Sequence, residues 1–272
     1  MTDRIAEHYT PGGDLAATIA AQLTRAGRDL SRLTTADLAA VDEFHVRGRA
    51  ATLEIARWLE AGPGDLVLDI GSGLGGPART LAETRGCRVV GVDLSPAYCA
   101  AATTLSSWVG LGERVSFRPG DATALPFGDG EFDAAMTLHV GMNIAAKPLM
   151  YGEARRVLKP GGRFTVYDVL QGEGGAVHFP VPWAGEPSIS HLATPEEMES
   201  LLAQAGFEIL HRHDSSDESL EWFEAMATRT STAPPPATLQ AVLGDAFPAM
   251  IRNQIANLRE RRIRTVGYLC RA

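Results

Sequence analysis

The chain has 272 residues, of which 45% are hydrophobic and 21% charged, so it can bury a full core and is neither disordered nor fibrous. Its formal net charge of −8 at pH 7 argues against a nucleic-acid-binding protein, because such proteins carry a basic surface. The three cysteines form no CxxC pair, which argues against a disulfide framework or structural zinc and indicates a reducing compartment. The chain shows no signal-like apolar segment near its start and no apolar run of about 18 residues, so we expect a cytoplasmic protein.

Residues 14–60 show the periodicity of helices. Apolar residues recur at three-and-four spacing after Asp14, and a second helix at about 48–60 stops before Gly62. We therefore expect an N-terminal helical cap over 1–60 and one α/β domain over 61–272.

Beyond residue 60, short apolar strands alternate with helices. Strands are predicted at 65–70, 88–92, 114–118, 132–137, 163–167, 207–210 and 263–270, and helices at 77–85, 96–109, 147–158 and 194–206, with a last amphipathic helix after the proline run 233–237. This alternation predicts right-handed parallel βαβ units, with helices on both faces of one doubly wound sheet.

One long segment, 169–193, breaks the alternation. It is rich in Gly, Pro, aromatic residues and His, and a loop of this length in a compact domain is usually either functional or disordered. Phe179 and Trp183 favour a lid or pocket wall over disorder. His178 and His191 lie in the same loop and are candidates for substrate contact, although exposed loop histidines are the simpler interpretation.

A glycine-rich loop follows the first strand. Gly71, Gly73 and Gly76 form a GxGxxG pattern between that strand and a helix, where glycines permit a tight turn and the helix N-terminus offers free N–H groups. Asp93 ends the second strand, 22 residues after Gly71, where a carboxylate can accept both hydroxyls of a ribose. The alternative is a tight turn that binds no ligand.

Asp69 narrows the class of ligand. It lies two residues before the first glycine of the loop, where a carboxylate would repel a pyrophosphate. It favours instead a ligand that carries an ammonium group. The same carboxylate could also bond the N–H groups of the loop itself.

These motifs resemble those of the class I S-adenosylmethionine-dependent methyltransferases over about 60–272. Residues 69–73 resemble the motif that lies against the methionyl part of the cofactor, Asp93 matches the ribose-binding acid, and 120–127 resemble the adenine motif. Residues 156–162 resemble the turn before the fifth strand. The resemblance implies a Rossmann-like, mostly parallel seven-stranded sheet and S-adenosylmethionine as cofactor.

The resemblance also implies which residues contact the cofactor. They follow the carboxyl ends of the strands and are Asp69, Gly71, Ser72, Gly73, Gly76, Asp93, Leu94, Asp121, Ala122, Leu138 and His139. Within the superfamily, residues 41–48 and 139–144 are similar to segments of the quinone-biosynthesis, sarcosine/dimethylglycine and natural-product sugar O-methyltransferase types. The expected activity is therefore methyl transfer to an oxygen or nitrogen of a small molecule.

His139 and Asp168 are the candidate catalytic groups. They follow the fourth and fifth strands, whose parallel carboxyl ends should meet, and an imidazole with a pKa near 6.5 suits a base at neutral pH. In the sugar O-methyltransferases that the chain resembles, a His and an Asp at these places are proposed as bases. The alternatives are that His139 packs against the cofactor and that Asp168 caps a loop.

The remaining substrate-contact candidates come from the cap and from the loops. They are Tyr9, His45, Met142, His178, Phe179, Trp183 and His191. Asp168, His178 and His191 could together hold a divalent metal, but no tight ligand spacing supports this. His211 and His213 have a spacing that can bind metal, but an exposed pair on an edge strand is the simpler interpretation, and we expect no metal. The arginines over 252–264 could attract an anion, although a solvated helix face is the usual meaning of such a run.

Other functions share these motifs. A carbon methyltransferase and a non-methylating protein that keeps the cofactor pocket, cyclase-like or purely binding, remain open because a fold does not fix a function. An NAD(P)-dependent oxidoreductase is a further alternative, against which Asp69 and Asp121 argue. We expect a small-molecule acceptor and no nucleic-acid partner, and long helices at both ends are compatible with a homodimer.

Overall fold

The computed structural model describes residues 14–230 and 244–272, and these are built around one seven-stranded sheet. The strand order is β3-β2-β1-β4-β5-β7-β6, in which β7 runs antiparallel to both of its neighbours and every other pair is parallel. This confirms the predicted Rossmann-like, mostly parallel sheet. The strands are β1 Leu66–Ile70, β2 Arg88–Asp93, β3 Val115–Pro119, β4 Phe132–Leu138, β5 Leu158–Gln171, β6 Glu208–Asp214 and β7 Ile263–Arg271.

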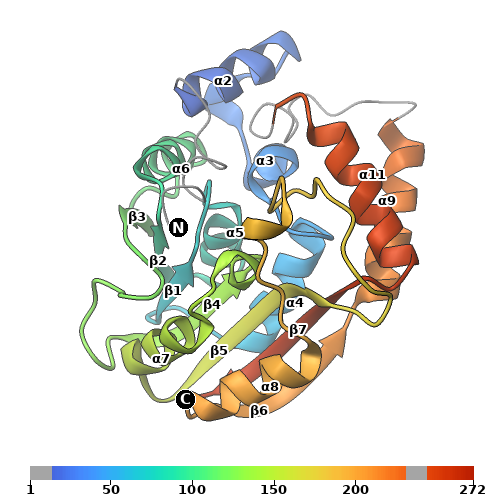
Figure 1. The fold of residues 1–272 in the computed structure, drawn as a ribbon. Coiled ribbons are helices and arrows are strands. Elements are labelled where there is room, and N and C mark those ends of the chain that lie inside the picture. The colour runs from blue at the N-terminus through green and yellow to red at the C-terminus, as the bar shows by residue number, and fades with distance from the viewer. Residues whose placement is uncertain (1–13, 231–243) are drawn as a thin grey trace.

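Helices cover both faces of the sheet (Figure 1). Alternate residues of a strand point to opposite faces, so Val67 belongs to the apolar cluster that includes residues of α4 and α5, and Leu68 to the cluster that includes residues of α7 and α8. The helices are α2 Leu15–Arg25, α3 Thr35–Asp42, α4 Arg49–Leu59, α5 Gly76–Arg85, α6 Pro96–Trp108, α7 Lys147–Val157, α8 Pro195–Gln204, α9 Ser216–Thr230 and α11 Phe247–Arg259.

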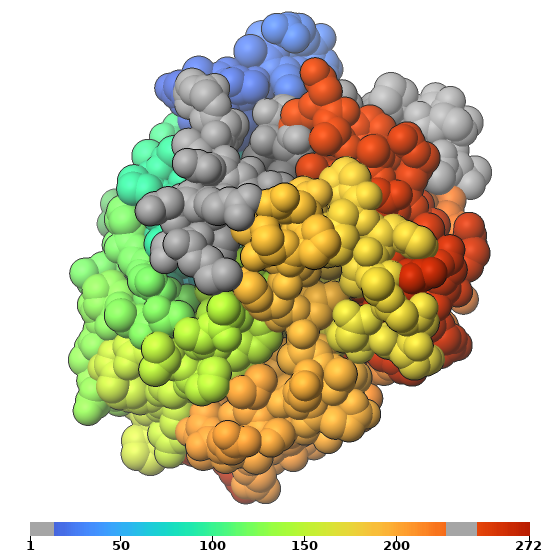
Figure 2. Space-filling view, viewed as in Figure 1, coloured from blue at the N-terminus to red at the C-terminus, as the bar shows by residue number. Residues whose placement is uncertain are grey.

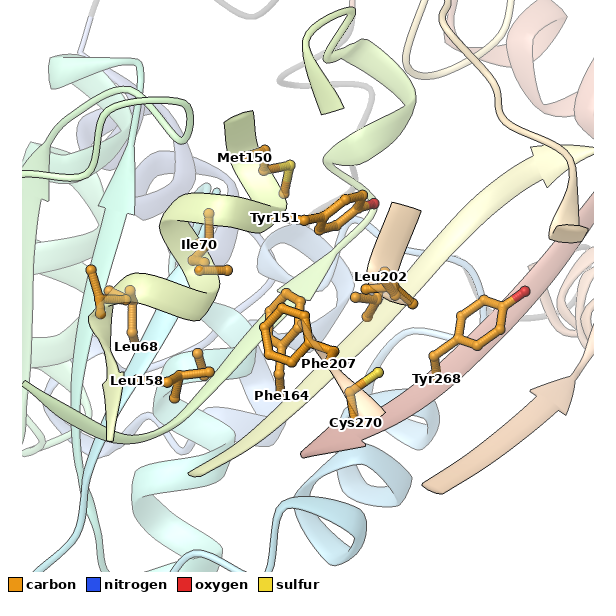
Figure 3. Packing of buried hydrophobic residues seen from close by; sticks show 14 of the residues in the cluster. Leu68, Ile70, Met150, Tyr151, Leu158, Phe164, Leu202, Phe207, Tyr268 and Cys270 are labelled. Carbon is orange, nitrogen blue, oxygen red and sulfur yellow. The ribbon is translucent and has the colours of Figure 1, made fainter. Parts of the chain in front are cut away.

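The largest apolar cluster lies between the sheet and the helices α7 and α8 (Figure 3). Phe164 of β5 and Phe207 before β6 stack with ring centroids 4.9 Å apart, and Tyr151 and Leu202 reach them from the two helices. Each such buried side chain contributes about 1.5–3 kcal/mol. This face holds the strands in register and fixes where their carboxyl ends emerge.

The N-terminal helices pack against the glycine-loop side of the sheet. Helix α3 begins with a capping box, in which Thr34 accepts from the backbone N–H of Asp37 and the Asp37 carboxylate accepts from that of Thr34. Leu38 and Val41 of α3 pack with Leu74 of the glycine loop. No helix within the described ranges is long and apolar enough to cross a membrane.

Three elements differ from the sequence-based expectations. Helix α9 is not expected, because its first turn is acidic and only its packing through Leu220 and Phe223 reveals its apolar side. Strands β5 and β6 run several residues longer than predicted. Both are extended at their carboxyl ends by pairing with β7, and β5 begins earlier because Leu158 pairs with Phe132 of β4. The proline run 233–237 lies outside the described residues.

Candidate functional site

The glycine loop makes a sharp turn between β1 and α5. Gly71, Gly73 and Gly75 all have positive φ, of 75°, 51° and 78°, which side chains rarely adopt. The N–H of Gly71 donates to the carbonyl of Val92 at 2.8 Å, and a Cβ at Gly71 would overlap Val140. The loop is therefore held against the end of β2 and against the segment that leaves β4.

Asp93 connects the end of β2 to the glycine loop. Its Oδ2 accepts from the N–H of Gly73 at 2.8 Å, and its Oδ1 accepts from the N–H of Ser95 at 2.9 Å. Burial raises the pKa of this carboxyl. Asp93 therefore orders the loop as well as facing the space in front of it.

A cavity of about 360 Å³ opens at the carboxyl ends of β1, β2 and β4. Most of the residues predicted for the site line it: Asp69, Gly71, Ser72, Gly73, Asp93, Leu94, Asp121, Ala122, Leu138, His139, His45, Met142 and Trp183. Five predicted residues are absent from its lining: Gly76, Asp168, His178, Phe179 and His191. Tyr9 lies outside the described residues.

The polar groups around the glycine loop fit a cofactor that carries positive charge. Asp69 is 1% exposed, and its Oδ2 has no hydrogen-bond partner in the part of the chain that the structure describes. Burial, together with the carboxyls of Glu43 and Asp93, raises its pKa to about 8. Burial of an unpaired carboxylate is unfavourable, whereas an ammonium group beside it would remove that cost.

The charge of the whole cavity points the same way. Four carboxyl groups line it, from Asp42, Asp69, Asp93 and Asp121, whereas no Lys or Arg among the described residues does. Such a lining suits a ligand with an ammonium and a sulfonium group and disfavours a pyrophosphate.

His139 follows β4 with a backbone φ of 55°, a left-handed conformation that is uncommon for histidine. Its N–H donates to the carbonyl of Tyr167 at 2.8 Å, and its ring centroid lies 5.1 Å from that of Tyr167 and 6.0 Å from that of His45. Its Nε2 is buried and has no hydrogen-bond partner within 14–230 and 244–272. Burial lowers the pKa of His139 well below the usual 6.5, with a smaller effect from His45, so the ring is neutral.

Asp168 lies within β5 and not at the cavity. The register pairs Leu138 with Tyr167, so the ends of β4 and β5 do meet. The carboxyl of Asp168, however, turns under Gly141, where a Cβ would overlap it, and its Oδ1 accepts from the N–H of Val169 at 3.0 Å. Burial raises its pKa to about 7. This position matches the loop-capping interpretation of Asp168 better than a catalytic one.

His45 reaches the cavity with its ring, while Nε2 points into the protein. That atom lies 2.9 Å from the carbonyl of Gly48 and 3.1 Å from the hydroxyl of Thr52. Burial lowers the pKa of His45 to about 4. The ring therefore provides an uncharged wall beside His139.

The loop 172–193 is fastened to the segment that follows β4. The side-chain amide of Asn143 donates to the carbonyl of Trp183 at 2.7 Å and to that of Ile189 at 3.1 Å. The N–H of His191 donates to the carbonyl of Met142 at 2.7 Å, and the ammonium of Lys147 donates to the carbonyl of His191. Figure 2 shows this loop, in yellow and orange, packed against α11. It forms a wall of the cavity through Pro182 and Trp183.

The other predicted groups lie away from the cavity. His178 pairs with Glu260 at 3.0 Å on the exposed side of α11. Arg264 forms ion pairs with Glu173 and Asp214, as expected of a solvated face. In the described parts of the chain, no group of three or more His, Cys, Asp or Glu side chains could hold a metal.

Sequence reasoning missed several lining residues. Phe44 and Ile144 lie in the segments 41–48 and 139–144, which resemble methyltransferase segments, but neither residue is singled out as a lining residue. Gln254 enters from α11. Gln254 is 3% exposed, yet a single glutamine on an amphipathic helix carries no sequence signal. Only the packing of α11 beside the loop 172–193 brings it to the cavity.

Residues 68–166 match the family model described as a methyltransferase domain. Sterol 24-C-methyltransferase of Eremothecium gossypii is 35% identical over 168 residues, which are 59% of this chain and 45% of that protein. The corresponding enzyme of Saccharomyces cerevisiae is 30% identical over 171 residues, 59% of this chain and 44% of the relative. The chain thus spans about half the length of the curated relatives that it matches.

Solved structures share the fold. Geranyl diphosphate C-methyltransferase from Streptomyces coelicolor A3(2), in complex with Mg²⁺, geranyl diphosphate and S-adenosyl-L-homocysteine, superposes with a TM-score of 0.67 at 20% identity, over 83% of this chain and 79% of that one. The [4+2]-cyclase SpnF superposes with a TM-score of 0.65 at 25% identity, over 82% and 79%.

The glycine loop, the acids that follow β1 and β2, the sheet order and these similarities agree with one another. They support S-adenosylmethionine, and not NAD(P), as the cofactor. Residues 68–166 thus match a methyltransferase domain, and the similarities support a class I S-adenosylmethionine-dependent methyltransferase.

Proposed function

We propose that this protein transfers the methyl group of S-adenosylmethionine to a carbon atom of a small molecule. The name of the sterol 24-C-methyltransferases to which the chain is similar supports carbon as the target. Our main sequence-based expectation, transfer to oxygen or nitrogen, is less well supported than this alternative.

The observation that carries the proposal is the state of His139. A general base that removes a proton from a hydroxyl works best when its pKa is close to the operating pH. Burial lowers the pKa of His139 well below 6.5, so its ring is a weak base. An alkene carbon needs no deprotonation before it attacks, because its π electrons are the nucleophile.

The residues around the cavity supply what such a reaction requires. When bound, S-adenosylmethionine supplies the methyl group and leaves as S-adenosylhomocysteine. Asp69 would hold the ammonium, Asp93 the ribose hydroxyls and Asp121 the adenine side, while the loop 172–193 would exclude water. A new C–C bond leaves a positive charge on the neighbouring carbon of the acceptor, and that cation is a strong acid.

We assign to His139 the role of accepting the proton that the cationic acceptor then loses. His139 lines the cavity, its Nε2 is buried without a partner among the described residues, and its ring is neutral. Transfer of a proton from the cationic acceptor to Nε2 restores an uncharged alkene. A weak base suffices for this step, because the donor is so acidic, whereas it would not suffice for a hydroxyl.

The test is transfer of a ¹³C-labelled methyl group to a panel of alkenes, alcohols and amines, with the product examined by NMR. The shift of the labelled carbon distinguishes C–CH₃ from O–CH₃ and N–CH₃. We expect C–CH₃ and no loss of kcat from protonation of His139 near pH 6.5, the usual pKa of histidine, because burial holds the pKa of His139 well below that value. A labelled O–CH₃ or N–CH₃ product would contradict the assignment to carbon.

His139→Gln tests the role of the imidazole. It keeps a polar side chain of similar length but removes the ring base, so kcat should fall by about 10²–10⁴-fold. Binding of S-adenosylhomocysteine should change little, which separates loss of the proton acceptor from loss of the site. An unchanged kcat would show that His139 only packs against its neighbours.

A further inference from the structure

The cavity has two chemically different halves. One half consists of the glycine loop and the acids that follow β1, β2 and β3. The other half is formed by the segment after β4, the loop 172–193, α11 and the turn after α3. Its side chains are mostly apolar and include Phe44, Met142, Ile144, Pro182, Trp183 and Gln254.

Most polar side chains of this second half are already bonded within the protein. The amide of Asn143 donates to the loop 172–193, and Nε2 of His45 is held by Gly48. Gln254 differs, because it lines the cavity from α11 at 3% exposure and its side chain is not hydrogen-bonded to another described residue. Its amide is therefore available to bond a polar group on the ligand.

Gln254 is held firmly in this place. Its neighbour Asn253 donates to the carbonyl of Pro180 at 2.9 Å, and Asn257, one turn further on, donates to the carbonyl of His178 at 3.0 Å. Both bonds tie α11 to the loop 172–193. The amide of Gln254 therefore enters the cavity from a fixed helix, beside Pro182 and Trp183.

The charge of the cavity restricts the acceptor further. Solved neighbours hold phosphorylated ligands, such as geranyl diphosphate and phosphomonomethylethanolamine. A phosphate requires cationic or metal partners. The described lining of this cavity includes four carboxyl groups, one of them paired with Arg79, and neither Lys nor Arg, so it offers a phosphate no cationic partner.

We propose that the acceptor is an uncharged, mostly apolar molecule with one hydroxyl or carbonyl group, and that Gln254 recognises this group by a hydrogen bond. The inference rests on the proposed function, since it concerns the acceptor of the same site. It makes Gln254 a specificity-determining residue and places the reacting carbon toward His139, which lines the cavity after β4 and has an unpartnered Nε2 among the described residues.

Matched pairs of compounds test the charge. Calorimetric titration in the presence of S-adenosylhomocysteine would compare geraniol with geranyl diphosphate, farnesol with farnesyl diphosphate, and cholesterol with cholesterol sulfate. We expect at least one neutral member to bind and its anionic counterpart to bind more weakly by 10-fold or more, on the order of one close charge repulsion. Tighter binding of the anionic members would overturn the inference. So would a failure of every neutral member to bind while S-adenosylhomocysteine binds.

Gln254→Leu tests the hydrogen bond. It should weaken binding of the neutral alcohol by about 3–10-fold, the usual effect of one neutral hydrogen bond, and leave the hydrocarbon of the same skeleton unaffected. Arg252→Leu, on the exposed side of the same helix, is the control and should change neither. Equal losses for alcohol and hydrocarbon would overturn the role of the amide.

Binding of S-adenosylhomocysteine separates failure of the proposed function from failure of the inference about the acceptor. S-adenosylhomocysteine should bind Gln254→Leu within about twofold of the wild type, because Gln254 lies in the other half of the cavity. If the wild type did not bind S-adenosylhomocysteine, the proposed function would fail. If it bound the cofactor product but preferred phosphorylated compounds, only the inference about the acceptor would fail.

Discussion

Asp69 combines nearly complete burial with an unpartnered Oδ2 among the described residues. Burial, with smaller contributions from the carboxyls of Glu43 and Asp93, raises its pKa to about 8. A carboxyl in such a place destabilises the protein when it is charged, and it becomes favourable only when a cation lies beside it. We therefore propose that Asp69 serves the binding of a ligand and not the stability of the fold.

Asp69→Asn should stabilise the protein increasingly as the pH rises. The folded-state pKa of about 8 exceeds the unfolded value of about 4, so the folded protein binds this proton more tightly. The free energy of unfolding of the wild type therefore falls between about pH 4 and 8, and the variant lacks this contribution. Urea unfolding at several pH values measures the difference.

Asp245→Asn is the matched control for this experiment, because Asp245 is exposed. Its unfolding curve should follow that of the wild type at every pH. If Asp69→Asn also followed the wild type, the carboxyl would not be protonated in the folded protein, and our account of its environment would be wrong.

Helix α5 joins the glycine loop to its neighbours through a fully buried arginine. The guanidinium of Arg79 donates to Asp42 Oδ2 at 2.7 Å, to the carbonyl of Leu74 at 2.5 Å and, on α6, to Ser106 Oγ at 3.0 Å. Leu74 belongs to the glycine loop, and Asp42 ends α3. One side chain thus fixes three elements that surround the cavity.

Arg79→Met should destabilise the protein by about 3–5 kcal/mol, because it leaves the carboxyl of Asp42 buried without its partner. Adding Asp42→Leu to this variant should restore much of the loss. Urea unfolding of both variants measures the effect, and Arg28→Met, which breaks an exposed pair with Asp37, should cost at most about 1 kcal/mol. A loss in the double variant as large as in the single variant would contradict this role.

The sequence predicts the site residues that belong to short, contiguous motifs. The glycines at 71 and 73 and the acids at 69 and 93 lie in short motifs, and the structure places all four at the cavity. The orientation of a side chain is not local. His139 and Asp168 both follow the expected strands, yet Asp168 turns under Gly141 while His139 faces the cavity, and nothing in the sequence distinguishes them.

The acceptor side of the cavity is the least predictable part for the same reason. Gln254 comes from α11, more than 100 residues after His139 in the chain. It reaches the cavity only because Asn253 and Asn257 bind the loop 172–193. Helix α9 escapes prediction too, since its apolar residues acquire meaning only against α11 and that loop.

At the scale of the molecule, the net charge of −8 and the acidic lining of the cavity act together. Arg79 is paired with Asp42, one of the lining carboxyls, whereas exposed arginines such as Arg264 are paired with carboxylates outside the lining. A cationic ligand should therefore be attracted over a distance, and salt should weaken that attraction.

Affinity for S-adenosylmethionine, which carries a sulfonium charge, should fall more steeply with ionic strength than affinity for S-adenosylhomocysteine, which does not. Titrations of both ligands at low and high sodium chloride concentration measure the two slopes. Parallel slopes would mean that the carboxyl groups of the cavity contribute no net field at the sulfonium position.

The central claim is that the acidic glycine-loop cavity binds S-adenosylmethionine, and calorimetric titration with S-adenosylhomocysteine tests it most directly. We expect saturable binding to the wild type, no binding of NAD, and affinity reduced by about 10-fold or more in Asp69→Asn, which loses a charge-assisted contact. Absence of binding to S-adenosylhomocysteine, or binding of NAD in its place, would contradict the account of the site.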